Sequence, residues 1–511
     1  MELALQAFRE FLSPQNVALS ALGVVGGIIV GAVPGLSVTM ATALLVSMTY
    51  AWDTKPALAM MLGIYAGGVY GGSRSAILIN IPGTPSAVAT GFDGYPMAQR
   101  GEAGMAIGLS TVQSFIGGVL GLVALVVAGP LISEFALKFA PRDYFLLVAM
   151  GLSLVSRLGA KSMPRALIAA AGGVLVGLVG MDPVTGEGRF TFGLPLLIGG
   201  VHFIAVLIGL FGLSEVFYQL GRVGRGDVPQ IKIPEVGRIL PSWALVLRFL
   251  PLSLRTSVLG IMVGALPGTG GEIAALLAYD HAKRTVRKPT RPFGQGAIEG
   301  VIAPETANNA AIGGALIPML TLGIPGDAVT AVLIGALFIH GLRPGPLLMV
   351  EMPDLFWFIA ASYALANVFL LIFGLMAVRP FVKLVNVNKK ILMPMIALIS
   401  VVGTYAIQNN IYDVFWMIGF GILGYFMKLG DYPVGPMVLG VILGPLADIN
   451  FRRAILSVRG SVPAFLLELV TNPISLVLTI MMLSAFVPRL PSSAALRGLL
   501  GRLRLGKREG A

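Results

Sequence analysis

One phrase occurs twice in this chain, and the repetition constrains its architecture more than any other feature. Residues 27–37 read GIIVGAVPGLS and residues 260–270 read GIMVGALPGTG, so both copies fit G-x₃-G-x₂-P-G at an offset of 233. A second Pro-Gly phrase follows each copy, LINIPGTPSAV at 78–88 and TLGIPGDAVTAV at 321–332, at an offset of 243. Two Pro-Gly breaks per half, in the same order and within apolar sequence, indicate a duplicated membrane unit.

The composition places the chain in a membrane. Hydrophobic residues make up 56% of it and charged residues only 12%, whereas soluble domains carry about 25% charged residues. We therefore predict an all-α polytopic membrane protein with about eleven to twelve spans of about 20 residues each. Uninterrupted candidates are 105–130, 143–157, 165–181, 193–212, 328–349, 355–378, 391–408, 411–427 and 463–488. The Pro-Gly-interrupted segments are 17–50, 57–92, 249–280 and 297–326, and 434–447 is short for a span.

The repeats divide the chain into five regions. We predict transport units at 17–130 and 249–349, scaffold helices with a cytoplasmic loop at 131–248, scaffold helices at 350–488, and a basic tail at 489–511.

The net charge of +12 does not indicate nucleic-acid binding, because the basic residues cluster in loops as the positive-inside rule predicts for cytoplasmic segments. The absence of cysteine excludes disulfides and thiolate metal sites. The predicted cytoplasmic loops are 157–165, 222–248, 281–294 and 379–390, and the predicted external loops are 181–190, 350–354 and 408–413.

Loop charge also predicts the orientation of the repeats. Basic loops flank 249–280 on both sides, so we expect a re-entrant hairpin that turns at Pro267-Gly268, whereas the corresponding loop 52–55 has no net charge. The two hairpins would then enter from opposite faces as an inverted repeat. A conflict remains at the C-terminal end, because arginines precede and follow 463–488. Either Asn472-Pro473 breaks that span, or one basic cluster lies outside.

The Pro-Gly breaks suggest a chemistry. Proline removes a backbone donor and suits the first turn of a new helix, so each break can begin a half-helix whose amides face the break. Such N-termini carry about half a positive charge and bind carboxylates or phosphates, while carbonyls at the preceding helix ends can hold a cation. A single break is usually a packing kink. The candidate break residues are Pro34, Gly35, Pro82, Gly83, Pro267, Gly268, Pro325 and Gly326.

Polar side chains accompany these breaks. The candidate substrate-binding residues are Ser37, Thr39, Ser73, Arg74, Asn80, Thr84, Thr269, Gly270, Asn308 and Asn309. Glu305 and Asp327 are candidate ion-coupling residues, since intramembrane ionisable groups are costly to bury and usually functional. Alternatives are open for Arg74, as an internal salt bridge or an interfacial side chain, and for Glu305, as an interfacial residue.

Five motifs carry a resemblance to a known family. GAVPGLS, YGGSRSAILINIPGTPSA, GALPGTGG, APETANNAA and LTLGIPGD resemble the large membrane subunit of the tripartite tricarboxylate transporters, over about residues 17–488. The resemblance implies carboxylate import across the bacterial inner membrane by ion-coupled secondary transport. It also implies a small membrane subunit of about four spans and a periplasmic solute-binding protein as partners. Citrate, other tricarboxylates, dicarboxylates and aromatic acids all remain possible substrates.

We therefore expect a carboxylate to bind near the midplane of the bilayer, where the broken helices meet. Sodium or protons would supply the driving force, and no other cofactor is expected. One alternative is an anion channel or uniporter for organic acids. An intramembrane enzyme is disfavoured because no paired acids or Ser/His/Asp set is evident at membrane depth. A purely structural scaffold is disfavoured by two preserved sets of breaks.

Overall fold

A computed structural model describes residues 2–33, 35–158, 162–224, 237, 239–376 and 389–484. Within these ranges the chain is almost entirely helical, which confirms the all-α polytopic fold. Eight described helices are long and apolar enough to cross a membrane, or up to nine if a bent pair counts as one span. Three shorter apolar helices are α3 (Val38–Thr49), α8 (Met163–Gly177) and α14 (Ala328–Ile339). The helices at the expected spans 57–92, 143–157 and 297–326 are also not among the eight, so the structure gives fewer such spans than the sequence predicted.

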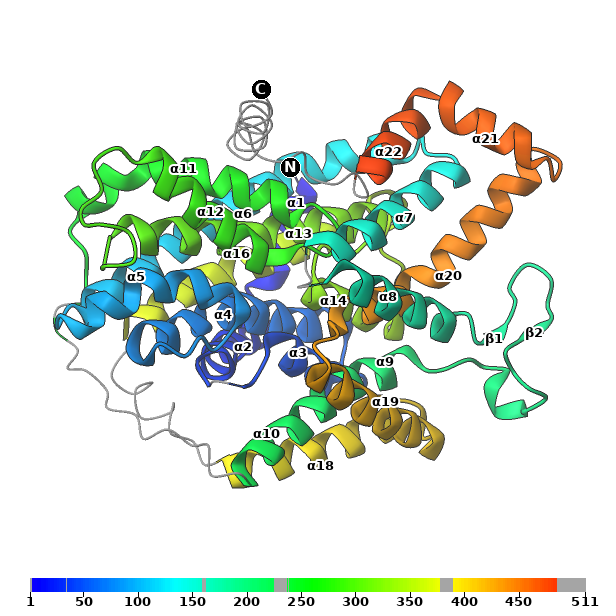
Figure 1. Ribbon diagram of the computed structural model, residues 1–511, viewed down its shortest axis with the longest axis horizontal. Coiled ribbons are helices and arrows are strands. Elements are labelled where there is room, and N and C mark those ends of the chain that lie inside the picture. The colour runs from blue at the N-terminus through cyan, green and yellow to red at the C-terminus, as the bar shows by residue number, and fades with distance from the viewer. Residues whose placement is uncertain are drawn as a thin grey trace, which may run out of the picture.

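The two repeats have the same order of elements (Figure 1). The first contains α2 (Pro14–Ala32), α3, α4 (Thr54–Ile79), the short 3₁₀ helix η1 (Pro85–Ala87) and α5 (Val88–Gln99), followed by α6 (Ala103–Ala136). The second contains α11 (Trp243–Gly264), α12 (Gly270–Thr285), α13 (Glu299–Leu322) and α14, followed by α15 (Leu348–Glu351) and α16 (Pro353–Met376).

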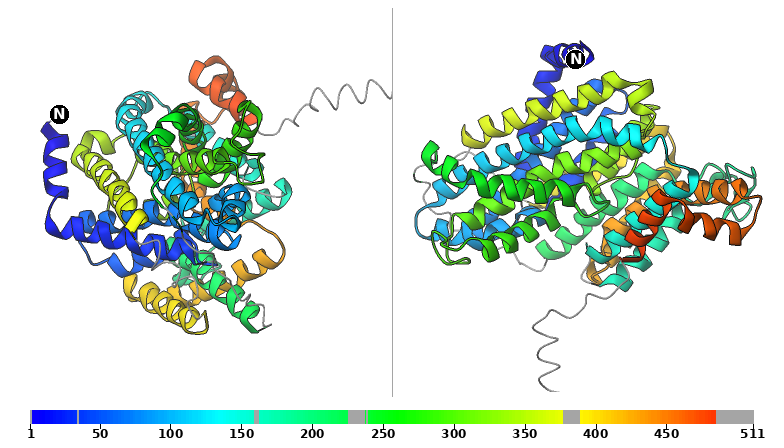
Figure 2. Two further views of the ribbon diagram at one scale, coloured as in Figure 1. Left: turned by 90° about the vertical axis from the view of Figure 1, so that its left-hand side faces the viewer. Right: turned by 90° about the horizontal axis from the view of Figure 1, so that it is seen from above.

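The remaining elements surround this pair. They are α1 (Glu2–Phe11), α7 (Pro141–Leu158), α8, β1 (Gly180–Met181), β2 (Gly188–Arg189), η2 (Pro195–Leu197), α9 (Phe203–Leu207), the π-helical η3 (Ile208–Leu213), α10 (Ser214–Gly224), α18 (Lys389–Gln408), α19 (Ile411–Leu429), α20 (Val434–Ser457), α21 (Val462–Thr471) and α22 (Pro473–Ser484). Strands β1 and β2 form one antiparallel ladder, with Gly180 opposite Arg189. Figure 2 shows the long helices gathered in one bundle, with α1 at its margin.

Helix packing repeats at the same offsets as the sequence. A Cβ atom at Gly27 would lie 2.5 Å from the carbonyl oxygen of Ile64, and one at Gly260 would lie 2.2 Å from that of Ala307. Four residues further along, about one helical turn, Gly31 meets Gly68 as Gly264 meets Ala311. Small residues allow such close backbone approach between membrane helices. The duplication is therefore a structural repeat, while its inverted orientation stays a prediction.

The breaks also repeat in their backbone conformation. Gly35 and Gly268 have φ of +94° and +72°, and Asn80 and Gly323 end α4 and α13 with φ of 54° and 70°. A left-handed residue commonly ends a helix, and glycine adopts it without steric cost. A left-handed residue therefore ends α4 and α13, and a new helix begins a few residues later in each repeat.

The two units are interlocked rather than merely adjacent. Helix α6, which follows the first unit, packs against α13 of the second, and α16, which follows the second, packs against α4 of the first. Gly117 of α6 contacts the backbone of Thr306, and Gly121 contacts that of Ala310. The four long helices thus form one central body.

The loop between α12 and α13 holds the extra residues of the second repeat and anchors that repeat to the first. The Asp93 carboxylate accepts hydrogen bonds from the backbone N–H groups of Gly294, Gly296 and Ala297 at 2.8 to 2.9 Å. Arg291 forms a two-pronged ion pair with Glu102 at 2.6 and 2.7 Å. Hydrogen bonding to Arg291 lowers the pKa of the Glu102 carboxyl.

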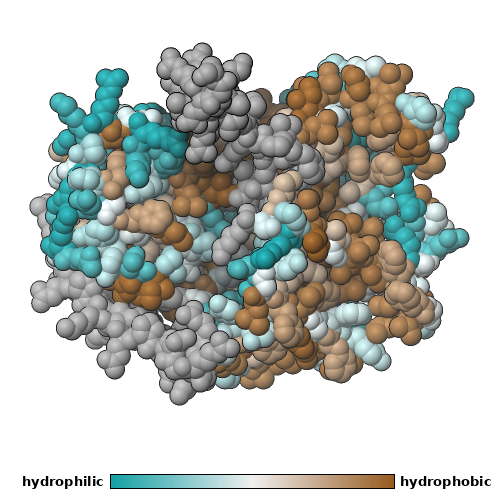
Figure 3. Space-filling model, viewed as in Figure 1, coloured by the Kyte–Doolittle hydropathy of each residue, from teal (hydrophilic) through white to brown (hydrophobic). Residues whose placement is uncertain are grey.

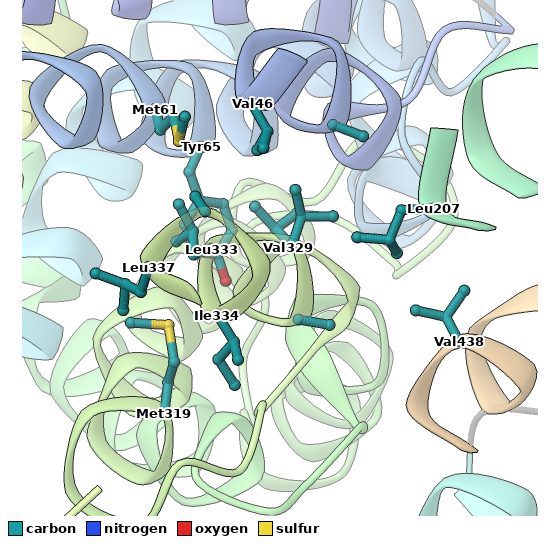
Figure 4. Close-up of a cluster of buried hydrophobic side chains, with 14 of the residues drawn as sticks. Val46, Met61, Tyr65, Leu207, Met319, Val329, Leu333, Ile334, Leu337 and Val438 are labelled. Carbon is teal, nitrogen blue, oxygen red and sulfur yellow. The ribbon is translucent and has the colours of Figure 1, made fainter. Parts of the chain in front are cut away.

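The half-helix α14 lies in a tightly packed apolar core. Figure 4 shows Val329, Leu333 and Ile334 of α14 among side chains from several other helices. All three are at most 6% exposed, and α14 contacts α3, α4, α9, α13 and α20. Since protein cores are close-packed, the break before α14 is held in one position.

The outer surface is consistent with a bilayer. Figure 3 shows hydrophobic residues over α20, α21 and the helices along the lower edge, whereas hydrophilic residues gather at the end of the bundle that carries the loop after α12. Exposed apolar side chains include Leu398 of α18, Phe415 of α19 and Leu467 of α21, at 61 to 65% exposure. A water-soluble monomer rarely exposes such extended apolar surface.

Several expected spans differ from the structure. The stretch 434–447 is not short, because it begins the 24-residue helix α20. The segment 463–488 is not one straight span, since α21 and α22 meet at 94° across Asn472-Pro473. Of 328–349, helix α14 ends at Ile339, and 193–212 becomes α-helical only at Phe203, after the 3₁₀ helix η2. Proline and side-chain capping by Asn472, whose Oδ1 accepts from the N–H of Ile474 at 3.0 Å, explain the bend.

Of the two alternatives for the C-terminal charge conflict, the break at Asn472-Pro473 is present, since α21 and α22 meet there at 94°. Arg452 of α20 forms ion pairs with Asp182 at 2.7 Å and with Asp448 at 3.0 Å, and Arg189 pairs with Asp448 at 2.8 Å. Arg452 is therefore paired with acids of its own helix and of the β1–β2 loop. The second cluster lies outside the described residues.

Candidate functional site

The four breaks meet at one cavity of about 480 Å³. Its lining includes the residue immediately before each of the four helices that restart after a break: Ser37 before α3, Thr84 before η1, Thr269 before α12 and Asp327 before α14. Four helix N-termini that are far apart in the sequence therefore lie at one cavity. An N-terminus concentrates unpaired N–H groups and positive potential.

Two of these residues cap their helices with side chains. The Ser37 hydroxyl accepts a hydrogen bond from the N–H of Met40 at 3.0 Å, and Asp327 accepts one from the N–H of Thr330 at 2.8 Å. The Thr330 hydroxyl in turn accepts from the N–H of Asp327, which completes a capping box. The Thr269 hydroxyl instead donates to the carbonyl oxygen of Leu266 at 3.0 Å, on the preceding side of the break.

The structure divides the residues proposed from sequence into two groups. Those that line the cavity are Ser37, Thr39, Thr84, Gly268, Thr269, Gly270, Asn308 and Asp327. Those described residues that lie outside its lining are Gly35, Ser73, Arg74, Asn80, Pro82, Gly83, Pro267, Glu305, Asn309, Pro325 and Gly326. Pro34 lies outside the described residues. Their binding roles stay predictions.

Asn308 combines burial with open hydrogen-bonding capacity. Its side chain lines the cavity, the residue is only 1% exposed, and within the described chain neither its Oδ1 nor its Nδ2 atom has a hydrogen-bond partner. Buried amide groups are normally paired, so an unpaired one at a cavity wall suggests a missing ligand or water. Neighbouring Asn309 points elsewhere, because its Nδ2 donates to the backbone oxygen of Glu305 at 3.0 Å.

Arg74 lies in a separate buried cluster. The residue is 2% exposed, its guanidinium donates to the Tyr70 hydroxyl at 3.1 Å and to the carbonyl oxygen of Gly374, and Tyr70 also contacts Thr111. This arrangement ties α4 to α16 and α6. Arg74 is therefore neither at the surface of the protein nor on the cavity wall.

Glu305 is the centre of a hydroxyl cluster. Its Oε1 atom accepts from Ser73 and Thr90, and its Oε2 atom accepts from Ser110 at 3.0 Å and from Ser114 at 2.8 Å. The four donors belong to α4, α5 and α6, while Glu305 belongs to α13. Glu305 is fully buried, so it does not lie at the surface of the bundle.

Sequence reasoning missed several cavity residues. Glu215 of α10 and Lys428 of α19 line the cavity and form an ion pair at 2.6 Å, although both helices lie outside the repeated units. Tyr65, also missed, donates from its hydroxyl to Asp327. Glu272, which the sequence places beside the Pro267-Gly268 break, lines the cavity in the first turn of α12. The available signal was a charge within apolar sequence, FGLSEVF and GYFMKLG, which marks a functional candidate by itself.

A helical membrane protein whose two repeated units bring discontinuous helices to one central cavity has the construction of a secondary transporter. A family model described as the tripartite tricarboxylate transporter TctA family matches residues 17–439. This chain belongs to that family, as its motifs suggested, and is its large membrane subunit.

Two curated relatives come from Agrobacterium vitis. An uncharacterized 52.8 kDa protein of the TAR-I ttuC′ 3′ region is 38% identical over 472 residues, which cover 92% of each chain. An uncharacterized protein of the TAR-II ttuC′ 3′ region is 42% identical over 217 residues, covering 42% of this chain and 87% of the relative. No solved structure matches this chain.

Proposed function

We propose that this chain imports an organic carboxylate across the bacterial inner membrane by secondary transport coupled to sodium or protons. A periplasmic solute-binding protein would deliver the substrate, and a small four-span membrane subunit would complete the transporter. The observation that carries the proposal is the convergence of four restarted helices, α3, η1 with α5, α12 and α14, on one cavity within a member of a transport family.

The cavity offers a carboxylate the partners that it needs. Helix N-termini stabilise anions, and the hydroxyls of Ser37, Thr39 and Thr84 can donate hydrogen bonds. The unpaired Nδ2 of Asn308 adds a further donor at the same wall. In this proposal the residues behind the cavity, Arg74 among them, hold the breaks in place.

Accumulation of the carboxylate against its concentration gradient distinguishes coupled transport from a channel or uniporter. Ligand screening of the cognate binding protein would first identify the carboxylate. Proteoliposomes that contain both membrane subunits and receive the loaded binding protein should then concentrate that carboxylate when a sodium or pH gradient is imposed. Uptake that stops at equal concentrations inside and outside would support a channel or uniporter and contradict ion coupling.

Dependence on partners gives a second expected result. Proteoliposomes with this chain alone should take up the carboxylate slowly at low concentration, because the family forms tripartite systems. Addition of the small subunit and the loaded binding protein should restore uptake. Full-rate, high-affinity uptake by the isolated chain would contradict the proposed dependence on partners.

The proposed inverted repeat predicts opposite sides for two loops. Asp53, just before α4, and Thr285, at the end of α12, are exposed, and the chain has no natural cysteine. In cells with a permeabilised outer membrane, an impermeant maleimide should label Asp53→Cys and leave Thr285→Cys unlabelled until the inner membrane is opened. Equal labelling of both cysteines in intact inner membranes would rule out the inverted arrangement.

A further inference from the structure

Glu272 is a carboxylate on the cavity wall to which the structure assigns no partner. Its side chain lines the cavity and is exposed to it, and among the described residues nothing donates a hydrogen bond or forms an ion pair with its carboxylate. Since a charged group within a helical membrane bundle is expensive, an unpaired one usually has a ligand.

The first turn of α12 places Glu272 beside two other oxygen-bearing side chains. A Cβ atom at Gly270 would lie 3.1 Å from the Cβ atom of Asp327, and one at Gly271 would lie 2.3 Å from Oδ1 of Asn308. All three side chains, Glu272, Asp327 and Asn308, line the same cavity. The absence of side chains at positions 270 and 271 is what allows this approach.

Asn308 is the second, independent indication of a ligand. It is buried, it faces the cavity, and its Oδ1 has no donor within the described chain. Asp327 is already held, because its Oδ1 accepts from the N–H and the hydroxyl of Thr330 and its Oδ2 accepts from the Tyr65 hydroxyl. A carboxylate oxygen has two lone pairs, so Oδ2 keeps capacity for a further contact.

The charge of the cavity wall favours a cation. Its described acidic residues are Glu215, Glu272 and Asp327, and its one described basic residue is Lys428, which pairs with Glu215. Two carboxylates therefore remain without a counter-charge, and a carboxylate substrate would add a third. Repulsion between like charges inside a protein opposes such binding, and a positive charge that enters with the substrate reduces it.

We propose that Glu272, Asp327 and Asn308 form a site for a hard monovalent cation, sodium, next to the bound carboxylate. Carboxylate and amide oxygens are the ligands that hard cations prefer. The coupling role of the site rests on the proposed transport function, whereas the site itself requires only these three side chains. Binding of the cation removes the repulsion that excludes the substrate, so each ligand raises the affinity for the other.

The hydrogen bonds of Glu305 argue against a cation site at its carboxylate. Each of its carboxylate oxygens already accepts two hydrogen bonds from buried hydroxyls. It also lies outside the cavity lining. A cation at Glu305 would have to displace hydroxyls that join three other helices.

The test is sodium binding by the purified full chain without substrate or partners. Equilibrium binding of radioactive sodium should be saturable, and sodium chloride should raise the thermal unfolding temperature relative to choline chloride at equal ionic strength. Glu272→Gln and Asp327→Asn should each weaken sodium binding by about tenfold or more, a loss of at least one charged ligand. Asparagine also caps helices well, so Asp327→Asn should preserve α14.

Glu134→Gln, which removes an exposed acid at the end of α6, is the control and should bind sodium like the unaltered chain. The inference is overturned if the unaltered chain shows no saturable sodium binding, or if both cavity variants bind as it does. A response to pH without any response to sodium would also overturn it, in favour of protonation. Because these measurements need no substrate, absent sodium binding alongside concentrative uptake would reject the cation site and keep the transport proposal.

Discussion

Alanine in place of Gly83 or Gly326 should abolish carboxylate uptake while the protein still inserts into the membrane. A Cβ atom at Gly83 would lie 1.9 Å from the carbonyl oxygen of Gly31, and one at Gly326 would lie 2.6 Å from that of Gly264. The obstructing atoms belong to helix backbones, so the breaks themselves must move. Overpacking of this kind typically costs about 1–3 kcal/mol, and it would displace the N-termini of η1 and α14 at the cavity.

The measurement is uptake by cells that carry the whole transporter, compared with the amount of each variant in the membrane. Gly172→Ala in α8 and Gly419→Ala in α19 are matched controls, because a Cβ atom at either helical glycine meets no atom within 4 Å. Both should keep full uptake and gain up to about 1 kcal/mol of stability from better helix propensity. Normal uptake by Gly83→Ala and Gly326→Ala would show that the position of the breaks does not matter.

The repeated units could be predicted from sequence because their signals are local. Proline and glycine interrupt helices wherever they occur, so the phrases around Gly35 and Gly268 locate two breaks without knowledge of their neighbours. The common offset of the two phrases also carries the helix contacts, since Gly27 and Gly260 approach equivalent backbones. The local Pro-Gly phrases were therefore enough to predict the two repeated units.

Features that depend on tertiary packing could not be predicted in this way. Ser73 and Arg74 are neighbours in sequence, but successive residues of a helix point about 100° apart. Arg74 faces Tyr70 and Gly374, away from the cavity, and only the placement of α16 shows this. Lys428 and Glu215 belong to helices outside the repeats, and nothing in the sequence relates them to the breaks.

Helix α20 shows the same limit at an element boundary. Its polar residues Asp448 and Arg452 suggested that the apolar stretch ends before them. In the structure these two residues continue the helix, because both form ion pairs. Arg452 pairs with Asp182 and with Asp448, and Asp448 also pairs with Arg189. Ion pairs formed with a distant loop thus allow polar turns within a long helix.

Replacement of Glu305 by alanine should cost more stability than replacement of any one of its four hydroxyl donors. Its carboxylate accepts hydrogen bonds from four buried hydroxyls on three other helices. Glu305→Ala leaves all four donors without their acceptor, and each unsatisfied buried group costs about 1–3 kcal/mol before relaxation. Glu305→Gln keeps the shape but replaces one acceptor oxygen by an N–H₂ donor, so at least two hydroxyls must turn away.

Thermal unfolding of the purified chain should therefore show a graded order. Ser114→Ala, which removes one of the four bonds, should cost about 0.5–1.5 kcal/mol, Glu305→Gln more, and Glu305→Ala the most. The exposed-acid variant Glu134→Gln should leave the unfolding temperature unchanged.

The same variants distinguish a positioning role of Glu305 from the coupling role proposed from sequence. If Glu305 positions α13 against α4, α5 and α6, the uptake that survives in Glu305→Gln should keep the sodium and pH dependence of the unaltered transporter. A coupling residue behaves in the opposite way, with altered ion dependence and little change in unfolding temperature.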